Sequence, residues 1–146
     1  MLSGLIISNL GVGAFATNIE ALARLLIPAF MAQNFAAMCV PQDPQFLAGS
    51  NLDPASVSAF AEQVKMEVTA GISEQETASI RVTAADAAGA VARQEIDLLR
   101  GQQRTPSPEA LRHWCNTSAK HFIVEIMHNH TEKRAEFEIL LNKAKR

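Results

Sequence analysis

The chain lacks tyrosine altogether, and aromatic residues make up only 5% of its 146 residues. A surface that stacks nucleobases or sugar rings needs several aromatic side chains, so such a surface is hard to build here. An excess of charge of one sign is also missing, because the net charge is only −2 at pH 7. Without a basic surface there is no electrostatic reason for nucleic acid to bind, and we expect none as a partner.

Catalytic signatures are missing as well. The sequence has no G-x-S-x-G motif, no phosphate-binding Walker loop and no G-x-G-x-x-G fingerprint. Its two cysteines do not form a C-x-x-C motif, which removes the usual basis for a redox centre or a zinc knuckle. We therefore expect a protein that is not an enzyme and that carries no cofactor.

Alanine is abundant in the chain, whereas β-branched residues are sparse. Alanine is the best helix former because ordering it costs no side-chain entropy, so we expect an all-α fold. The length suits a single domain. Helical periodicity begins near residue 19, and Pro28 interrupts it, because proline removes a hydrogen bond and clashes with the preceding turn. The sequence thus predicts a kinked first long helix.

The later helices are marked by start and stop signals. Asp53-Pro54 places an N-cap before a proline at the first helical position, and Ser73 opens a capping box. The helix that begins at Ser73 is expected to stop at Gly101, and the last helix is expected to run unbroken over residues 108–144. Four to five helices with short connections predict a helical bundle, mainly antiparallel.

Residues 2–16 form an apolar run that ends in Ala14-Phe15-Ala16. An apolar stretch followed by an A-x-A site has the form of a secretory signal peptide, although no Lys or Arg precedes it here. A run of about 15 residues is short for a membrane span. The alternative to a signal peptide is therefore a docking helix that is retained in the mature protein. We expect residues 1–16 to be separate from one helical domain over 17–146. The expected location is periplasmic or secreted, with the cytoplasm as the alternative.

Cys39 and Cys115 are predicted to form a disulfide. Cys39 ends the first long helix, and Cys115 lies near the start of the last one. The bond would close a long loop and would stabilise the fold by about 4 kcal/mol through the entropy of the unfolded chain. An even number of cysteines behind a signal-like segment is typical of an oxidising compartment. Two buried free thiols in a cytosolic bundle are the alternative.

All four histidines lie between His113 and His130. On a helical wheel, alternating imidazoles and carboxylates form a ladder along one line of the last helix: His121, Glu125, His128 and Glu132. These groups are ligands for zinc or another transition metal. The ladder points away from the apolar face, however, so a solvated polar stripe is the alternative. His130 falls on the apolar face, where we expect a neutral histidine whose pKa is lowered by burial.

The apolar face of the last helix is expected to supply much of its core contact. Its members are Leu111, Cys115, Ala119, Phe122, Ile123, Ile126, Phe137, Leu140 and Leu141. Trp114 falls beside this face, so we expect it at the edge of the bundle.

These observations favour a non-catalytic binding or accessory protein of an extracytoplasmic compartment. The apolar surface of the uncharged segment 1–16 would be unfavourable if it were exposed to water. We therefore expect the segment to associate with a partner protein or with another copy of the chain. One alternative is a metal-binding bundle that uses the ladder from His121 to Glu132. Another is a peripheral membrane-surface protein held by residues 1–16.

Overall fold

The computed structural model of the chain describes residues 17–146, so the apolar run over residues 2–16 lies outside the described residues. The described part forms five helices and no strand, which confirms the expected all-α bundle. The first three helices are α2 (Ile19–Cys39), α3 (Pro54–Thr69) and α4 (Glu74–Arg100). The fourth is continuous through α5 (Pro108–Trp114), the π-helical turn η1 (Cys115–Ala119) and α6 (Lys120–Glu132), and the fifth is α7 (Arg134–Lys145).

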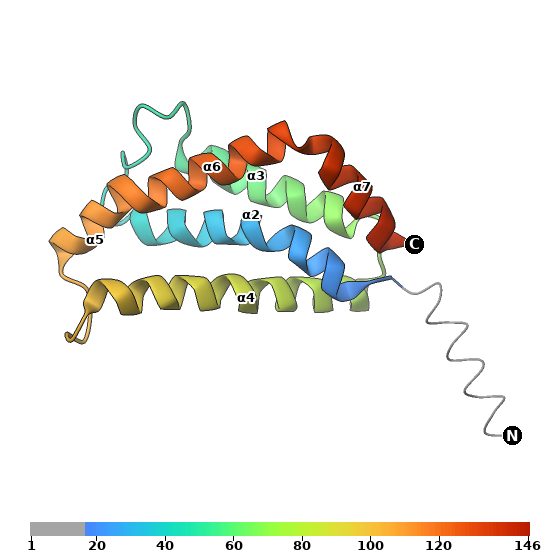
Figure 1. Ribbon diagram of the computed structural model, residues 1–146, viewed down its shortest axis with the longest axis horizontal. Coiled ribbons are helices and arrows are strands. Elements are labelled where there is room, and N and C mark those ends of the chain that lie inside the picture. The colour runs from blue at the N-terminus through green and yellow to red at the C-terminus, as the bar shows by residue number, and fades with distance from the viewer. Residues whose placement is uncertain (1–16) are drawn as a thin grey trace, which may run out of the picture.

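Helix α2 lies in the middle of the bundle, with α4 on one side and α3 and α6 on the other (Figure 1). Successive long helices run antiparallel, so that α2 and α4 run in the same direction. Helix α2 packs against α3, α4, η1, α6 and α7. By length and composition α2 is also apolar enough to cross a membrane. Its central position gives a sufficient reason for that composition, because a helix surrounded by others is apolar on most sides.

The predicted helix ends are confirmed. The Asp53 carboxylate accepts a hydrogen bond from the backbone N–H of Ser56 at 2.7 Å, which caps α3. The Ser73 hydroxyl accepts from the backbone N–H of Glu76 at 3.2 Å and donates to its carboxylate at 3.0 Å. Gly101 ends α4 with a positive φ of 58°, a conformation that glycine adopts without steric cost.

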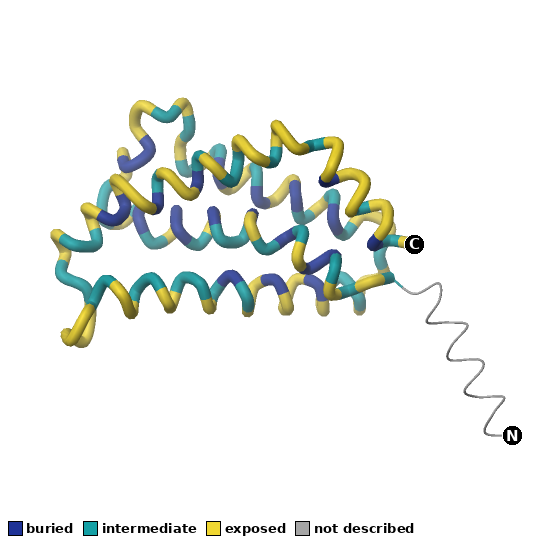
Figure 2. The backbone as a smooth tube through the Cα atoms, in the orientation of Figure 1, coloured by how far each residue is buried: buried dark blue, intermediate teal, exposed yellow. Residues whose placement is uncertain are grey.

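The core consists of two clusters arranged along α2, whose buried positions form an inward stripe in Figure 2. The cluster nearer the start of α2 includes Leu22, Leu26, Val64, Val68 and Ile80. The other includes Phe35, Phe46, Val57, Trp114 and Ile123. Phe46 comes from the loop between α2 and α3, so this connection contributes to the core instead of lying wholly on the surface.

The prediction of one unbroken last helix over residues 108–144 is wrong. The helical conformation is interrupted at Lys133, where φ is −107° and ψ is 30°, and α7 then turns away from α6 (Figure 1). No proline or glycine lies there to signal a break. The physical cause is tertiary: Phe137 and Ala144 are buried in the core, and Arg134 pairs with Glu67 on α3. These contacts outweigh the local preference for a straight helix.

The predicted apolar face is also corrected in part. A π-helical turn accommodates about one extra residue, which rotates the following residues by roughly 100° relative to an ideal α-helix. Trp114, which precedes the turn, is only 6% exposed instead of lying at the edge of the bundle, and its ring packs edge-on against Phe35 at 5.2 Å between centroids. Phe122 is 40% exposed instead of buried. Leu140, which lies beyond the break, is 45% exposed.

Candidate binding site

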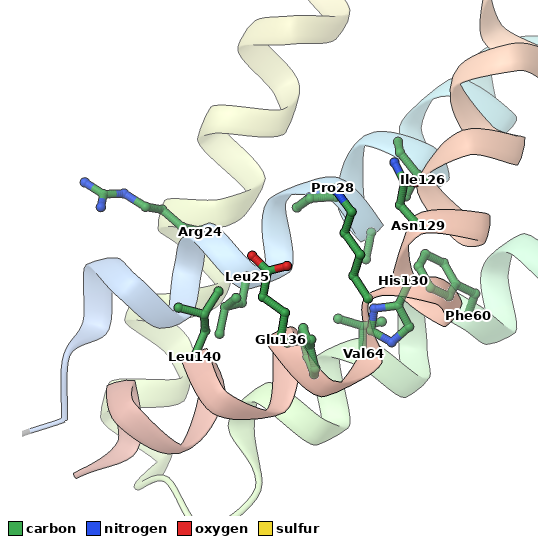
Figure 3. A pocket seen from close by; sticks show the side chains of 13 residues that line it. Arg24, Leu25, Pro28, Phe60, Val64, Ile126, Asn129, His130, Glu136 and Leu140 are labelled. Atoms are coloured by element: carbon green, nitrogen blue, oxygen red, sulfur yellow. The ribbon is translucent and has the colours of Figure 1, made fainter.

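The bend between α6 and α7 borders an open hollow of about 340 Å³, lined by α2, α3, α6 and α7. We call it the α2–α7 pocket (Figure 3). Its apolar lining residues are Leu25, Pro28, Ala29, Phe60, Val64, Ile126, Phe137 and Leu140. Its polar lining residues are Arg24, Asn129, His130, Lys133 and Glu136. A volume near 300 Å³ is at the lower end for pockets that hold a small ligand.

The pocket has an apolar floor and a polar mouth. Ala29, Val64 and Phe137 are buried. By contrast, Arg24, Asn129, Lys133 and Glu136 are all exposed, together with the apolar Pro28 and Leu140, so the mouth is mainly polar. A concave apolar surface with a few polar groups at one side is the usual form of a small-molecule site. This arrangement fits a ligand that has an apolar part and a polar part.

Pro28 shapes the wall that α2 contributes. Because proline has no backbone N–H, the Arg24 carbonyl lacks the hydrogen bond that position 28 would otherwise donate. Both residues line the pocket. The proline therefore leaves an additional backbone acceptor in this part of α2. From the sequence, Pro28 was expected only to kink the helix.

His130 lies in the inner part of the pocket between two aromatic rings. Its imidazole is 5.3 Å from the Phe60 ring and 4.7 Å from the Phe137 ring, both edge-on. Arg134 is always protonated and can only donate, so its guanidinium donates to Nε2 of His130 at 3.2 Å. This contact favours the neutral imidazole with its proton on Nδ1, because only an unprotonated Nε2 can accept a hydrogen bond.

The pKa of His130 is shifted in the predicted direction. Burial lowers the pKa of His130 below its ordinary value of 6.5, and the positive charge of Arg134 lowers it further. The carboxylate of Glu67 acts in the opposite direction but is the smaller influence. The side chain is half-buried instead of fully buried, because one edge of the ring faces the pocket.

A polar network behind His130 fastens α7 to α3. Arg134 donates to both carboxylate oxygens of Glu67, at 3.0 Å to Oε1 and by a second hydrogen bond to Oε2. This hydrogen bonding lowers the pKa of Glu67 and raises that of Arg134. Lys145 donates to the carbonyl oxygens of Glu67 and Ala70, both at 2.8 Å, and burial lowers its pKa. The network holds α7 at the angle that forms the pocket.

The four predicted metal ligands do not gather at one point. His121 Nε2 lies 3.0 Å from Glu125, and His128 Nε2 lies 3.7 Å from Glu132. They form two separate pairs, offset by about two turns along the exposed side of α6. Within residues 17–146, no three His, Cys, Asp or Glu side chains are close enough together to hold a metal ion. The ladder points to solvent, as expected, and its binding of zinc or another transition metal remains an untested alternative.

Cys39 and Cys115 are paired as predicted, with a Cα–Cα distance of 5.5 Å and a sequence separation of 76 residues. The disulfide joins the end of α2 to η1. It belongs to the second core cluster, whereas Val64 and Phe137 of the pocket belong to the first.

A second hollow, of about 510 Å³, lies between α2 and α4. Only two helices bound it, and polar Gln33, Asn34 and Arg81 are among its lining residues. The α2–α7 pocket is walled by four helices and is more apolar, so it is the stronger candidate.

Sequence reasoning identified Pro28 and His130 one at a time and did not place them in one pocket. No sequence signal indicated that they lie close together. The bend at Lys133 brings α7 over α2, and no glycine or proline marks this bend in the sequence. Comparison of the chain with known protein families, curated proteins and solved structures finds no match.

Proposed function

We propose that this protein is a non-catalytic binding protein of an extracytoplasmic compartment, and that the α2–α7 pocket receives the apolar part of its ligand. The observation that carries the proposal is the pocket itself, with its apolar floor and its exposed polar mouth. Removing an apolar group from water is favourable in proportion to the area covered. A hollow of this kind therefore has an intrinsic affinity for alkyl groups.

The residues of the pocket support binding over catalysis. None of the described lining residues is a serine, threonine or cysteine, which are the usual nucleophiles of covalent catalysis. The one imidazole has its Nε2 occupied by Arg134, so that nitrogen is not available to take a proton from a substrate.

The proposed compartment, periplasmic or secreted, rests on two observations. A disulfide in a small domain is typical of oxidising compartments. The apolar run before Ala14-Phe15-Ala16 has the form of a secretory signal. The alternative, a cytoplasmic location, would keep Cys39 and Cys115 reduced.

Association with a partner protein through residues 1–16 is an additional prediction. Co-purification of the native protein tests it: the full chain should retain a partner, or should self-associate, and the variant without residues 1–16 should not. Unchanged assembly and unchanged membrane association after the deletion would contradict both this prediction and the membrane-surface alternative.

The pocket is tested directly with a non-ionic alkyl probe, dodecyl maltoside, at concentrations below its micelle threshold. Calorimetry should detect binding to the native protein. Leu140→Asp should weaken binding by at least about tenfold, because a carboxylate beside the alkyl chain loses hydration. The matched control is Ile139→Asp, since Ile139 is the neighbouring residue, is 66% exposed and does not line the pocket. Equal loss in both variants, or no binding to the native protein, would contradict the proposed site.

A further inference from the structure

The mouth of the α2–α7 pocket carries unpaired charges of both signs. Lys133 lies at the break between α6 and α7, and Glu136 lies in the first turn of α7. Both line the pocket and both are exposed. Neither side chain forms an ion pair or hydrogen bond with another residue within 17–146. Each therefore remains available to a ligand.

The third charged residue of the mouth is already engaged. Arg24 donates to Glu20 at 2.5 Å, one turn earlier on α2. In Figure 3 its guanidinium points away from the hollow, whereas the Glu136 carboxylate lies near Leu25 at the opening. The charges left for a ligand are thus one ammonium, from Lys133, and one carboxylate, from Glu136.

The volume of the hollow matches an apolar part that consists of one chain. A water molecule occupies about 30 Å³ of liquid, and a methylene group is of similar size. A hollow of about 340 Å³ therefore holds on the order of ten methylenes. One medium-length alkyl chain fits this space, whereas the two chains of a bilayer lipid do not.

We propose that the pocket binds a single-chain zwitterionic amphiphile, such as a compound of the lysophospholipid class. The alkyl chain lies on the apolar floor, an anionic phosphate faces Lys133, and a cationic ammonium faces Glu136. A purely anionic head would meet the Glu136 carboxylate, and a purely cationic head would meet the Lys133 ammonium. This inference rests on the proposed function, because it assigns a ligand class to the same site.

The test compares four dodecyl amphiphiles with different heads, each below its micelle threshold, by calorimetry on the full chain. They are zwitterionic dodecylphosphocholine, anionic dodecyl phosphate, cationic dodecyltrimethylammonium and non-ionic dodecyl maltoside. Dodecylphosphocholine should bind best, by about threefold to fivefold over the others, since an exposed charge pair contributes only modestly. Equal binding of all four would refute the charge pairing and leave the proposed function intact. No binding of any would refute both.

Two substitutions separate the charges. Lys133→Gln should weaken dodecylphosphocholine binding by about threefold and strengthen binding of the cationic probe. Glu136→Gln should also weaken dodecylphosphocholine binding but strengthen binding of the anionic probe. The controls are Lys143→Gln, at an exposed position of α7 outside the pocket, and Asp86→Asn, at an exposed position of α4. Neither should change any affinity. Loss of the same size in a control and in its matched variant would overturn the assignment.

Discussion

Arg134 at the start of α7 donates hydrogen bonds to both carboxylate oxygens of Glu67 on α3, and the two residues are 67 positions apart in the chain. A bidentate pair of this kind fixes orientation as well as distance. Together with the two hydrogen bonds from Lys145 to the end of α3, it holds α7 at an angle to α6. The α2–α7 pocket exists because of that angle.

Arg134→Gln should lower the free energy of unfolding by about 1–2 kcal/mol, because the partly buried Glu67 carboxylate loses its main partner. The same variant should bind dodecyl maltoside more weakly, since α7 is less firmly held. Urea unfolding gives the first quantity and calorimetry the second. Arg24→Gln, which removes the exposed pair with Glu20, should cost no more than about 0.5 kcal/mol. Similar losses in both variants would contradict the role of the Arg134 pair.

Stability should fall as the pH falls below 6.5, because of His130. Burial, followed by the charge of Arg134, lowers its pKa in the folded state, so the unfolded chain binds this proton more readily. The stability that the neutral His130 contributes is therefore fully present above pH 6.5, the ordinary pKa of histidine. It is lost as the pH falls below that value. The lowered pKa of Glu67 has its effect only as the pH falls below its ordinary value of 4.5.

Urea unfolding across this pH range measures the effect, and NMR of the imidazole measures the titration itself. His130→Gln should reduce the pH dependence, whereas His113→Gln, on an exposed position of α5, should leave it unchanged. A His130 imidazole that titrates at or above 6.5 would rule out this account.

Removal of the disulfide by Cys39→Ala with Cys115→Ala should lower the free energy of unfolding by about 4 kcal/mol, because the unfolded chain regains the freedom of a long loop. Mass spectrometry of the native protein without reductant should show the mass of the bonded form. Two free thiols in the protein isolated from its natural source would contradict both the bond and the proposed compartment.

Metal binding by the ladder on α6 can be decided by elemental analysis. Because His121 pairs with Glu125 and His128 pairs with Glu132 on an exposed surface, each pair offers only two ligands, fewer than zinc sites usually have. We expect no zinc to remain after dialysis. Stoichiometric zinc that disappears with both His121→Ala and His128→Ala would instead establish the four-residue site.

Several features follow from neighbours along the chain and were predicted correctly. Asp53 and Ser73 start helices, and Gly101 stops one, through hydrogen bonds and backbone conformations that involve residues within one turn. His130 was expected to be neutral because the helical period places it among apolar residues, and its contacts with Phe60 and Phe137 agree with this.

The failures begin where the last helix departs from ideal geometry. The π-helical turn at Cys115–Ala119 and the break at Lys133 each change which side of the following residues faces inward. A wheel drawn with one constant rotation per residue cannot relate the residues before the turn to those after it. It therefore misplaced Trp114 before the turn and Phe122 after it, as well as Leu140 beyond the break.

The sequence by itself determined that the chain is helical, where its first three helices begin, and which two cysteines are available for a disulfide. Those properties depend on propensities, on caps and on composition, all of which act over a few residues. Only the tertiary structure decided that α7 bends across α2 and that a pocket opens beneath it. Its causes are contacts between distant residues, above all Arg134 with Glu67 and the burial of Phe137 against α2 and α3. These contacts outweigh the small local preference for a continuous helix.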